Sequence, residues 1–244
     1  MINQLFKEID HLQKEINALR PFNEQEIKQI KEYYKIGLTY TSNALEGNSL
    51  TETETKIVIE EGLTIGGKPL KDHLEVVGHA DAYDLLLNLS QNKEITEDSI
   101  KELHRLFYLR IDERNAGVYR KVKAYITGSK YPLPVPKDIS RLMGELIPRI
   151  QSIRGKKHPV EIASLVHKEF VFIHPFVDGN GRVARLLMNL VLLQEGYNIA
   201  LIPFVCRNQY IESLEKAHTN DSDFIDLVAR MVRETQKDYL RIFC

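Results

Sequence analysis

The stretch HPFVDGNGRVAR, residues 174–185, carries the strongest structural signal in the chain. Pro175 disfavours helical geometry at His174, and Gly179 and Gly181 permit backbone conformations that are closed to other residues, so the sequence predicts a tight turn. Apolar residues recur every three or four positions on both sides of it, which indicates amphipathic helices. The turn is therefore expected to join two helices, the second of which begins directly after the glycines.

The same periodicity predicts an all-α chain outward from this turn. Asn23 with Glu26, and Thr51 with Glu54, form capping boxes that open two helices. A first helix is expected from its apolar stripe, which Pro21 would end: Ile2, Leu5, Phe6, Ile9, Leu12, Ile16 and Leu19. Further helices are expected over residues 72–89, 96–108, 138–153, 161–173, 182–195, 208–218 and 223–243.

Residues 117–136 depart from the helical pattern. The run VYRKVKAYI is rich in β-branched and aromatic residues, and Gly128-Ser129 then supplies a turn signal, so the segment predicts a β-hairpin. Pro132, Pro134 and Pro136 cannot donate ladder hydrogen bonds, which confines the second arm to an exposed edge. Because a lone exposed hairpin is marginally stable, we expect this one to cover a site.

Composition limits the partners that the chain can have. Lysine plus arginine (33) nearly balances aspartate plus glutamate (34) over 244 residues, so no nucleic-acid or membrane partner is expected. No apolar run approaches the ~20 residues of a membrane helix, and the N-terminus does not resemble a secretory signal. Cys206 and Cys244 have no disulfide or zinc spacing. These features predict one cytoplasmic globular unit over residues 1–244.

The turn also places several chemical groups within twelve residues. Backbone N–H groups around two glycines at a helix N-terminus form a partly positive, concave site that suits a phosphate. Arg182 and Arg185 are three residues apart, so both can face one anion. His174 has a near-neutral pKa suited to a general base, and Asp178 offers the hard oxygen ligand that Mg²⁺ prefers.

The stretch resembles the signature of the Fic family, HPFx(D/E)GNGRxxR, and matches it at every fixed position. The resemblance extends over about residues 35–220, and residues 117–136 resemble the flap that lies over the active site in this family. It implies the Fic fold, with catalytic core helices and loop over residues 158–195. It also implies an AMP-transferase that moves AMP from ATP to a serine, threonine or tyrosine hydroxyl of a protein, with Mg²⁺ as cofactor.

The resemblance assigns roles to individual residues. It makes His174 the base that takes the hydroxyl proton, and Asp178 the Mg²⁺ ligand. Gly179, Asn180 and Gly181 would cradle the phosphates, while Arg182 and Arg185 would hold the triphosphate tail. The residues that would border the nucleotide are Thr127, Gly128, Ser129, Lys130 and Tyr210, with His218 where some relatives carry an asparagine near the adenine.

A second pattern lies within the N-terminal helices, residues 1–50. The run SNALEG, residues 42–47, matches (S/T)xxxE(G/N), which resembles the inhibitory helix of some Fic proteins. Ser42 and Glu46 are four apart and share one helix face. By this resemblance Glu46 would pair with Arg185 and inhibit the protein from within the same chain.

Several alternatives remain open from the sequence. His167, His174 and Asp178 would allow a metal-dependent phosphohydrolase, and the loop and hairpin would also suit a non-catalytic nucleotide- or peptide-binding module. Transfer of another phosphate-bearing group, and removal of AMP by the reverse reaction, are further alternatives. The sequence does not identify the target protein, decide whether the protein modifies itself, or show whether the first apolar stripe packs in the core or forms a homodimer.

Overall fold

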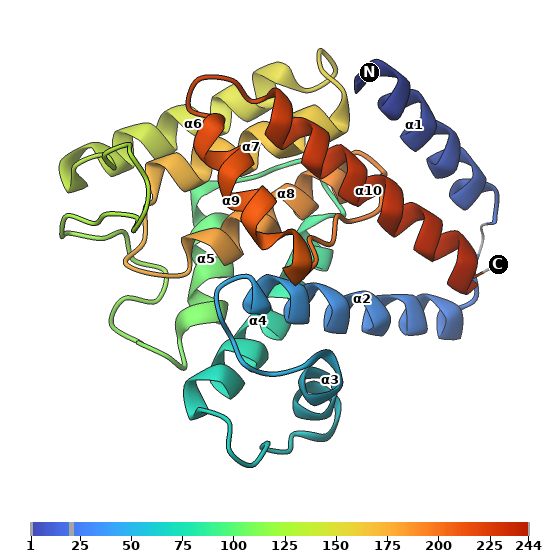
Figure 1. The fold of residues 1–244 in the computed structure, drawn as a ribbon, viewed down its shortest axis with the longest axis horizontal. Coiled ribbons are helices and arrows are strands. Elements are labelled where there is room, and N and C mark those ends of the chain that lie inside the picture. Colours follow the sequence, from blue (N-terminus) through green and yellow to red (C-terminus); the bar gives the residue numbers. More distant parts are fainter. Residues whose placement is uncertain (1, 20–21, 244) are drawn as a thin grey trace.

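The computed structural model describes residues 2–19 and 22–243, and within these ranges it contains helices and no strand (Figure 1). The predicted helix stop at Pro21 and the terminal Cys244 lie outside them. No helix in these ranges is long and apolar enough to cross a bilayer. The elements are α1 (Ile2–Ala18), α2 (Glu24–Ala44), α3 (Glu52–Glu61), α4 (Leu70–Leu89), α5 (Glu97–Tyr108), η1 (Pro136–Asp138), α6 (Ile139–Ile153), α7 (Pro159–Ile173), α8 (Asn180–Gln194), η2 (Phe204–Cys206), α9 (Arg207–Lys216) and α10 (Ser222–Phe243).

Local capping sets where several helices begin. Asn23 and Glu26 form the predicted reciprocal capping box at α2, with distances of 2.9 Å and 2.8 Å. Thr51 and Glu54 do the same at α3. These predictions are confirmed, because each cap satisfies backbone N–H groups that the first helical turn leaves without a partner.

Helix α8 lies at the centre of the molecule and is buried along almost its whole length. It contacts α7, α4, α5 and α2, so apolar side chains surround it on every side (Figure 1). A helix that is buried all round is held firmly by its neighbours. The turn at the start of α8 is therefore fixed from several directions.

The apolar stripe of α1 packs inside the chain. Ile9 and Ile16 are fully buried, and α1 lies against α10 (Figure 1). The buried side-chain amide of Gln236 on α10 donates to the Ile9 carbonyl and to Gln13 Oε1. The sequence left open whether this stripe packs in the core or forms a dimer. Ile9 and Ile16 pack in the core.

The β-hairpin predicted for residues 117–136 is wrong, because this segment, hereafter the flap, contains no strand. Its two arms are joined by a side chain in place of a backbone ladder. Arg120 donates from Nη1 to the Val122 carbonyl and from Nη2 to the Pro134 carbonyl. At the tip, Glu215 accepts from Ser129 Oγ and Lys130 N, each at 2.8 Å. These side-chain contacts therefore bind backbone groups that would pair with each other in a hairpin.

Candidate active site

The turn between α7 and α8 depends on two left-handed residues. His174 caps α7 with φ 50° and ψ 59°, and it is the one non-glycine residue with positive φ in the described ranges. Gly179 precedes α8 with φ 78°, and a Cβ there would lie 2.8 Å from Phe107 Cε1. Glycine is therefore required at 179 for both conformation and space. The strained backbone at His174 is of the kind that clusters at functional sites.

Two buried side chains lock this turn. Asn180 Oδ1 accepts from Phe176 N and its Nδ2 donates to Phe176 O, both at 2.9 Å. His104 Nδ1 accepts from Gly117 N at 2.8 Å, which leaves Nε2 to donate to the Asp178 carbonyl at 3.1 Å. The sequence placed Asn180 in the phosphate cradle. Its side chain closes the loop, which leaves the backbone N–H of Asn180 for the predicted cradle.

A carboxylate occupies the space over the start of α8. No side chain caps Gly179, so the first N–H groups of the helix have no side-chain acceptor at the cap. A Cβ built on Gly181 would lie 2.3 Å from Glu46 Oε1. The Glu46 side chain thus stands at an anion-attracting helix N-terminus.

Arg185 holds the Glu46 side chain in this position by an ion pair. Its Nη2 donates to Glu46 Oε1 and to the Ser42 carbonyl at 2.8 Å each, and its Nε donates to Ser42 Oγ at 3.0 Å. Helix α2 ends at Ala44, but Leu45 N still bonds to Thr41 O, so Ser42 and Glu46 stay on one side. Burial alone would raise the pKa of Glu46, and the nearby arginine charges outweigh it, so the pKa is lowered.

A buried chain of polar groups continues behind Arg185. Its Nη1 donates to the Tyr210 hydroxyl at 3.1 Å, and that hydroxyl is 2.9 Å from His167 Nε2. His167 is fully buried, and burial lowers its pKa well below the usual value. The described residues contain no cluster of His, Cys, Asp or Glu that would hold a metal ion. The two-histidine metal site considered from the sequence is therefore wrong.

Arg182 faces different partners from Arg185. It pairs with Glu75 of α4 at 2.8 Å and with Asp178 at 3.4 Å, and its guanidinium lies over Phe107 at 4.4 Å. Only 3% of Arg182 is exposed. Sequence reasoning missed Glu75, because no local pattern indicates that α4 would meet the start of α8.

Asp178 retains one accessible carboxylate oxygen. Its Oδ1 accepts from Gly179 N at 2.6 Å and from Arg182, while among the described residues Oδ2 has only Lys71 Nζ, at 4.0 Å. The side chain is 44% exposed. A hard oxygen in this position suits Mg²⁺, which keeps several waters and takes one or two carboxylates from a protein.

His174 opens onto a cavity of about 260 Å³. Its Nδ1 lies 3.3 Å from the Val171 carbonyl, which favours a proton on Nδ1 and a lone pair on Nε2. Burial is the main cause that lowers the pKa of His174 below 6.5, so the imidazole is neutral at pH 7. The predicted site residues that line this cavity are His174, Gly181, Glu46, Thr127, Ser129 and Tyr210.

The other predicted flap residues, Gly128 and Lys130, lie at the edge of this cavity. Gly128 has φ 87° and forms the turn at the flap tip, and the side chain of Lys130 lines a neighbouring cavity. His218 is stacked between Phe172 and Tyr131, with ring centroids 3.6 Å and 3.7 Å apart. All three rings line the cavity that holds His174. This aromatic stack was missed, since it requires α9 and the flap to meet.

Arg207 also lines the cavity and was missed. Its Nε donates to the Leu45 carbonyl at 2.8 Å, next to Glu46. The signal was present in the sequence, because Arg207 precedes Tyr210 by three residues on one helix and so shares its face.

A helical core that presents a histidine, an anion-attracting turn and buried arginines around one cavity defines a class of protein with a phosphate-binding site. Residues 94–192 match the family model described as the Fic/DOC family. Together with the relatives described next, this shows that the chain belongs to the Fic/DOC family.

The relatives and solved structures agree with this assignment. The chain is 36% identical over 217 residues to Protein adenylyltransferase Fic of Nematostella vectensis, covering 87% of this chain and 50% of that protein. It thus spans about half the length of the curated relatives it matches. Fic-1 (residues 134–508) from C. elegans aligns with a TM-score of 0.87 at 27% identity, over 98% of this chain and 71% of that one. A Fic domain containing signaling protein from Bacteroides thetaiotaomicron aligns with a TM-score of 0.85 at 29% identity, over 94% and 95%.

Proposed function

We propose that the protein is an adenylyltransferase that transfers AMP from ATP to a hydroxyl of a protein. The observation that carries this proposal is the convergence of His174 and the Gly181 backbone on one cavity, with Arg185 directly beneath. Relatives over most of the chain are named Protein adenylyltransferase Fic, which supports the same activity.

His174 would act as the general base. Its neutral Nε2 would take the proton from the target hydroxyl, a contribution of roughly 10²–10⁴-fold. The hydroxyl oxygen would then form a bond to the α-phosphorus of ATP as the bond to the bridging oxygen breaks. Pyrophosphate carries away that electron pair, so AMP becomes esterified to the protein.

The start of α8 would bind the phosphates. Backbone N–H groups of Gly179, Asn180 and Gly181 would donate to phosphate oxygens, and Arg185 would hold the end of the triphosphate. Asp178 Oδ2 would hold Mg²⁺, which neutralises phosphate charge when bound. Arg182, already paired with Glu75, would position Asp178 beside the phosphates.

The flap end of the cavity would receive the nucleoside. Thr127 and Ser129 line it from the flap, and Tyr210 lines it from α9. Both faces of the His218 ring are covered by Phe172 and Tyr131, so Tyr131, at the end of this stack, would offer the aromatic ring on which a nucleobase could stack.

Glu46 would inhibit this reaction. Its carboxylate occupies the place over Gly181 and the Arg185 guanidinium that the triphosphate needs. ATP would then bind in a pose that leaves its α-phosphate out of line with the hydroxyl. Removing the side chain would free both groups for the nucleotide.

The test compares labelling by ATP radiolabelled at the α- or the γ-phosphate. The Glu46→Gly protein should label itself, or a protein in a lysate, with the α-label only, and wild type much less. Adding His174→Ala to that variant should abolish the signal. Transfer of the γ-label would indicate a kinase, whereas ATP binding without any transfer would indicate a non-catalytic module, and either result refutes the proposal.

A further inference from the structure

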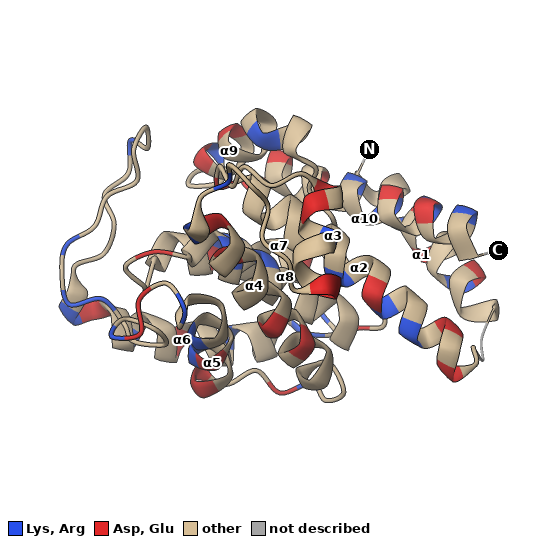
Figure 2. Cartoon of the chain, turned by 90° about the horizontal axis from the view of Figure 1, so that it is seen from below, with Lys and Arg blue, Asp and Glu red and all other residues tan. Residues whose placement is uncertain are grey.

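The flap has a charge that the rest of the molecule does not share. Between Glu113 and Asp138 the sequence contains four lysines and two arginines and no acid, although the whole chain has a net charge of −1. Figure 2 shows this segment as an arm projecting from one side, with blue positions and no red along it. The positive charge is therefore a local property of this arm.

The flap lysines are free to meet an external charge. Lys121, Lys123 and Lys130 are exposed. Within the described part of the chain Lys121 and Lys123 form no ion pair, whereas the charge of Lys130 acts on the nearby Glu215 carboxylate. Arg120 is buried and used to join the two arms, so it does not contribute to this surface. The three exposed ammonium groups, of which only Lys130 has an acid beside it in the described residues, create a field that attracts acidic side chains.

Backbone N–H groups of the first arm are also unpaired in the described residues. The N–H groups of residues 121–126 have no hydrogen-bond partner in residues 2–19 and 22–243. Tyr125 is 87% exposed and Val122 is 61% exposed beside them. Free backbone groups next to exposed apolar side chains suit an extended polypeptide, which supplies both backbone partners and side chains.

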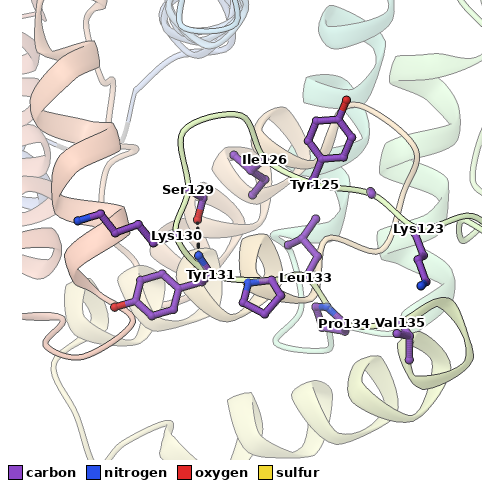
Figure 3. A pocket seen from close by; sticks show the side chains of 11 residues that line it. Lys123, Tyr125, Ile126, Ser129, Lys130, Tyr131, Leu133, Pro134 and Val135 are labelled. Atoms are coloured by element: carbon purple, nitrogen blue, oxygen red, sulfur yellow. Dashed lines mark hydrogen bonds between the residues drawn. The ribbon is translucent and has the colours of Figure 1, made fainter.

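The flap surface leads directly into the site. A cavity of about 520 Å³ opens between the arms and is lined by Lys123, Tyr125 and Lys130 among others (Figure 3). It shares Ile126, Ser129, Tyr131 and Leu133 with the cavity that holds His174. A segment lying on the flap would therefore continue toward the proposed base.

We propose that the modified segment is an extended acidic stretch of a protein, whose Asp or Glu residues flank the target hydroxyl and pair with Lys121, Lys123 and Lys130. This inference rests on the proposed AMP transfer. The positive charge and the aromatic rings would also suit a single strand of nucleic acid. The unpaired backbone N–H groups of the flap favour a polypeptide, because its carbonyl groups can accept their hydrogen bonds.

The experiment uses the Glu46→Gly protein and three synthetic peptides of equal length, each with a central hydroxyl flanked by Glu, by Gln or by Lys. Serine, threonine and tyrosine versions of each are compared. The Glu peptide should be modified roughly tenfold faster than the Gln peptide, judged by kcat/KM, and the advantage should shrink as salt rises. Lys121→Glu with Lys123→Glu should reverse the preference toward the Lys peptide.

A matched control reverses two charges elsewhere. Lys7 and Lys14 are exposed on α1, far from the flap (Figure 1), so Lys7→Glu with Lys14→Glu changes the net charge equally and should leave the preference unchanged. Equal rates for the three peptides, or no modified peptide while self-labelling proceeds, would overturn the acidic-segment proposal alone. Tighter binding of a single-stranded oligonucleotide than of the Glu peptide by the His174→Ala protein would also overturn it. Absence of all labelling would refute AMP transfer itself.

Discussion

Glu46 Oε1 lies where a side chain on Gly181 would begin, since a Cβ at residue 181 would be 2.3 Å from that oxygen. The same carboxylate oxygen is 2.8 Å from Arg185 Nη2. One acid thus occupies a helix N-terminus and its nearest buried guanidinium together. In the proposed reaction a phosphate would bind both of these groups, so carboxylate and phosphate would be alternatives at one place.

Substitutions that remove the Glu46 charge, or the whole side chain, test this relationship. Glu46→Gln keeps the size and loses the charge, so its rate of self-labelling should lie between those of wild type and Glu46→Gly. Initial rates at saturating ATP give the order. Glu52→Gln, at an exposed position of α3, is a control that should match wild type. A Glu46→Gln rate equal to that of wild type would show that the ion pair is not the restraint.

The Tyr210 hydroxyl is predicted to stabilise the fold. It receives Arg185 Nη1 and faces His167 Nε2 in a fully buried position, so Tyr210→Phe leaves both groups without this partner. The expected cost is about 1–3 kcal/mol in the free energy of unfolding, measured by urea denaturation. Tyr125→Phe removes an exposed hydroxyl and should cost almost nothing. Equal stabilities for the two variants would contradict the buried network.

The sequence predicted what local rules determine. Capping boxes at Asn23 and Thr51 fixed the starts of two helices because the donors and acceptors are three residues apart. The turn at residues 174–181 was likewise predicted, since proline and glycine restrict or free the backbone on their own. Periodicity placed the helices, with ends that differ by one or two residues.

The sequence could not predict what distant side chains determine. The β-rich run of residues 118–126 forms no strand, because Arg120 takes the carbonyls of both arms and Glu215 holds the tip. The pairing of Arg182 with Glu75 divides two arginines that the helix spacing had placed together. The contacts of Glu75 and Glu215 depend on how α4 and α9 pack, which local patterns do not encode.

Arg120 is predicted to position His174, the proposed general base. Its Nε donates to the His174 carbonyl at 2.8 Å while its other nitrogens hold the flap, and burial lowers its pKa. In the Glu46→Gly background, Arg120→Gln should lower kcat roughly 10- to 100-fold with a smaller change in the KM for ATP. Arg120→Lys should recover part of the loss. A normal kcat in a folded Arg120→Gln protein would contradict this role.

The activity of the Glu46→Gly protein should persist below neutral pH. A base works in its neutral form, which dominates above its pKa, and burial lowers the pKa of His174 below 6.5. The acid limb of kcat/KM should therefore lie below pH 6.5. An acid limb centred above pH 6.5 would contradict a buried, neutral His174.

Stability should fall over the same pH range for a different reason. Burial lowers the pKa of His104 to about 4, whereas in the unfolded chain it is near 6.5. Above pH 6.5 both states are neutral. As the pH falls from 6.5 toward 4, His104 binds a proton in the unfolded chain but not in the folded protein. The free energy of unfolding therefore falls by roughly 1.4 kcal/mol per pH unit.

This loss can be separated from ordinary acid denaturation. Carboxylates with lowered pKa values, such as Glu195 and Asp221, titrate below their usual range and contribute little between pH 7 and pH 5. The urea midpoint of wild type should therefore drop between these two values. His104→Gln should be less stable at pH 7 and should lose less between pH 7 and pH 5. The buried His79 and His167 also have lowered pKa values and add to the loss in wild type, so the comparison with His104→Gln isolates the share of His104. A loss in His104→Gln as large as that in wild type would contradict a neutral, buried His104.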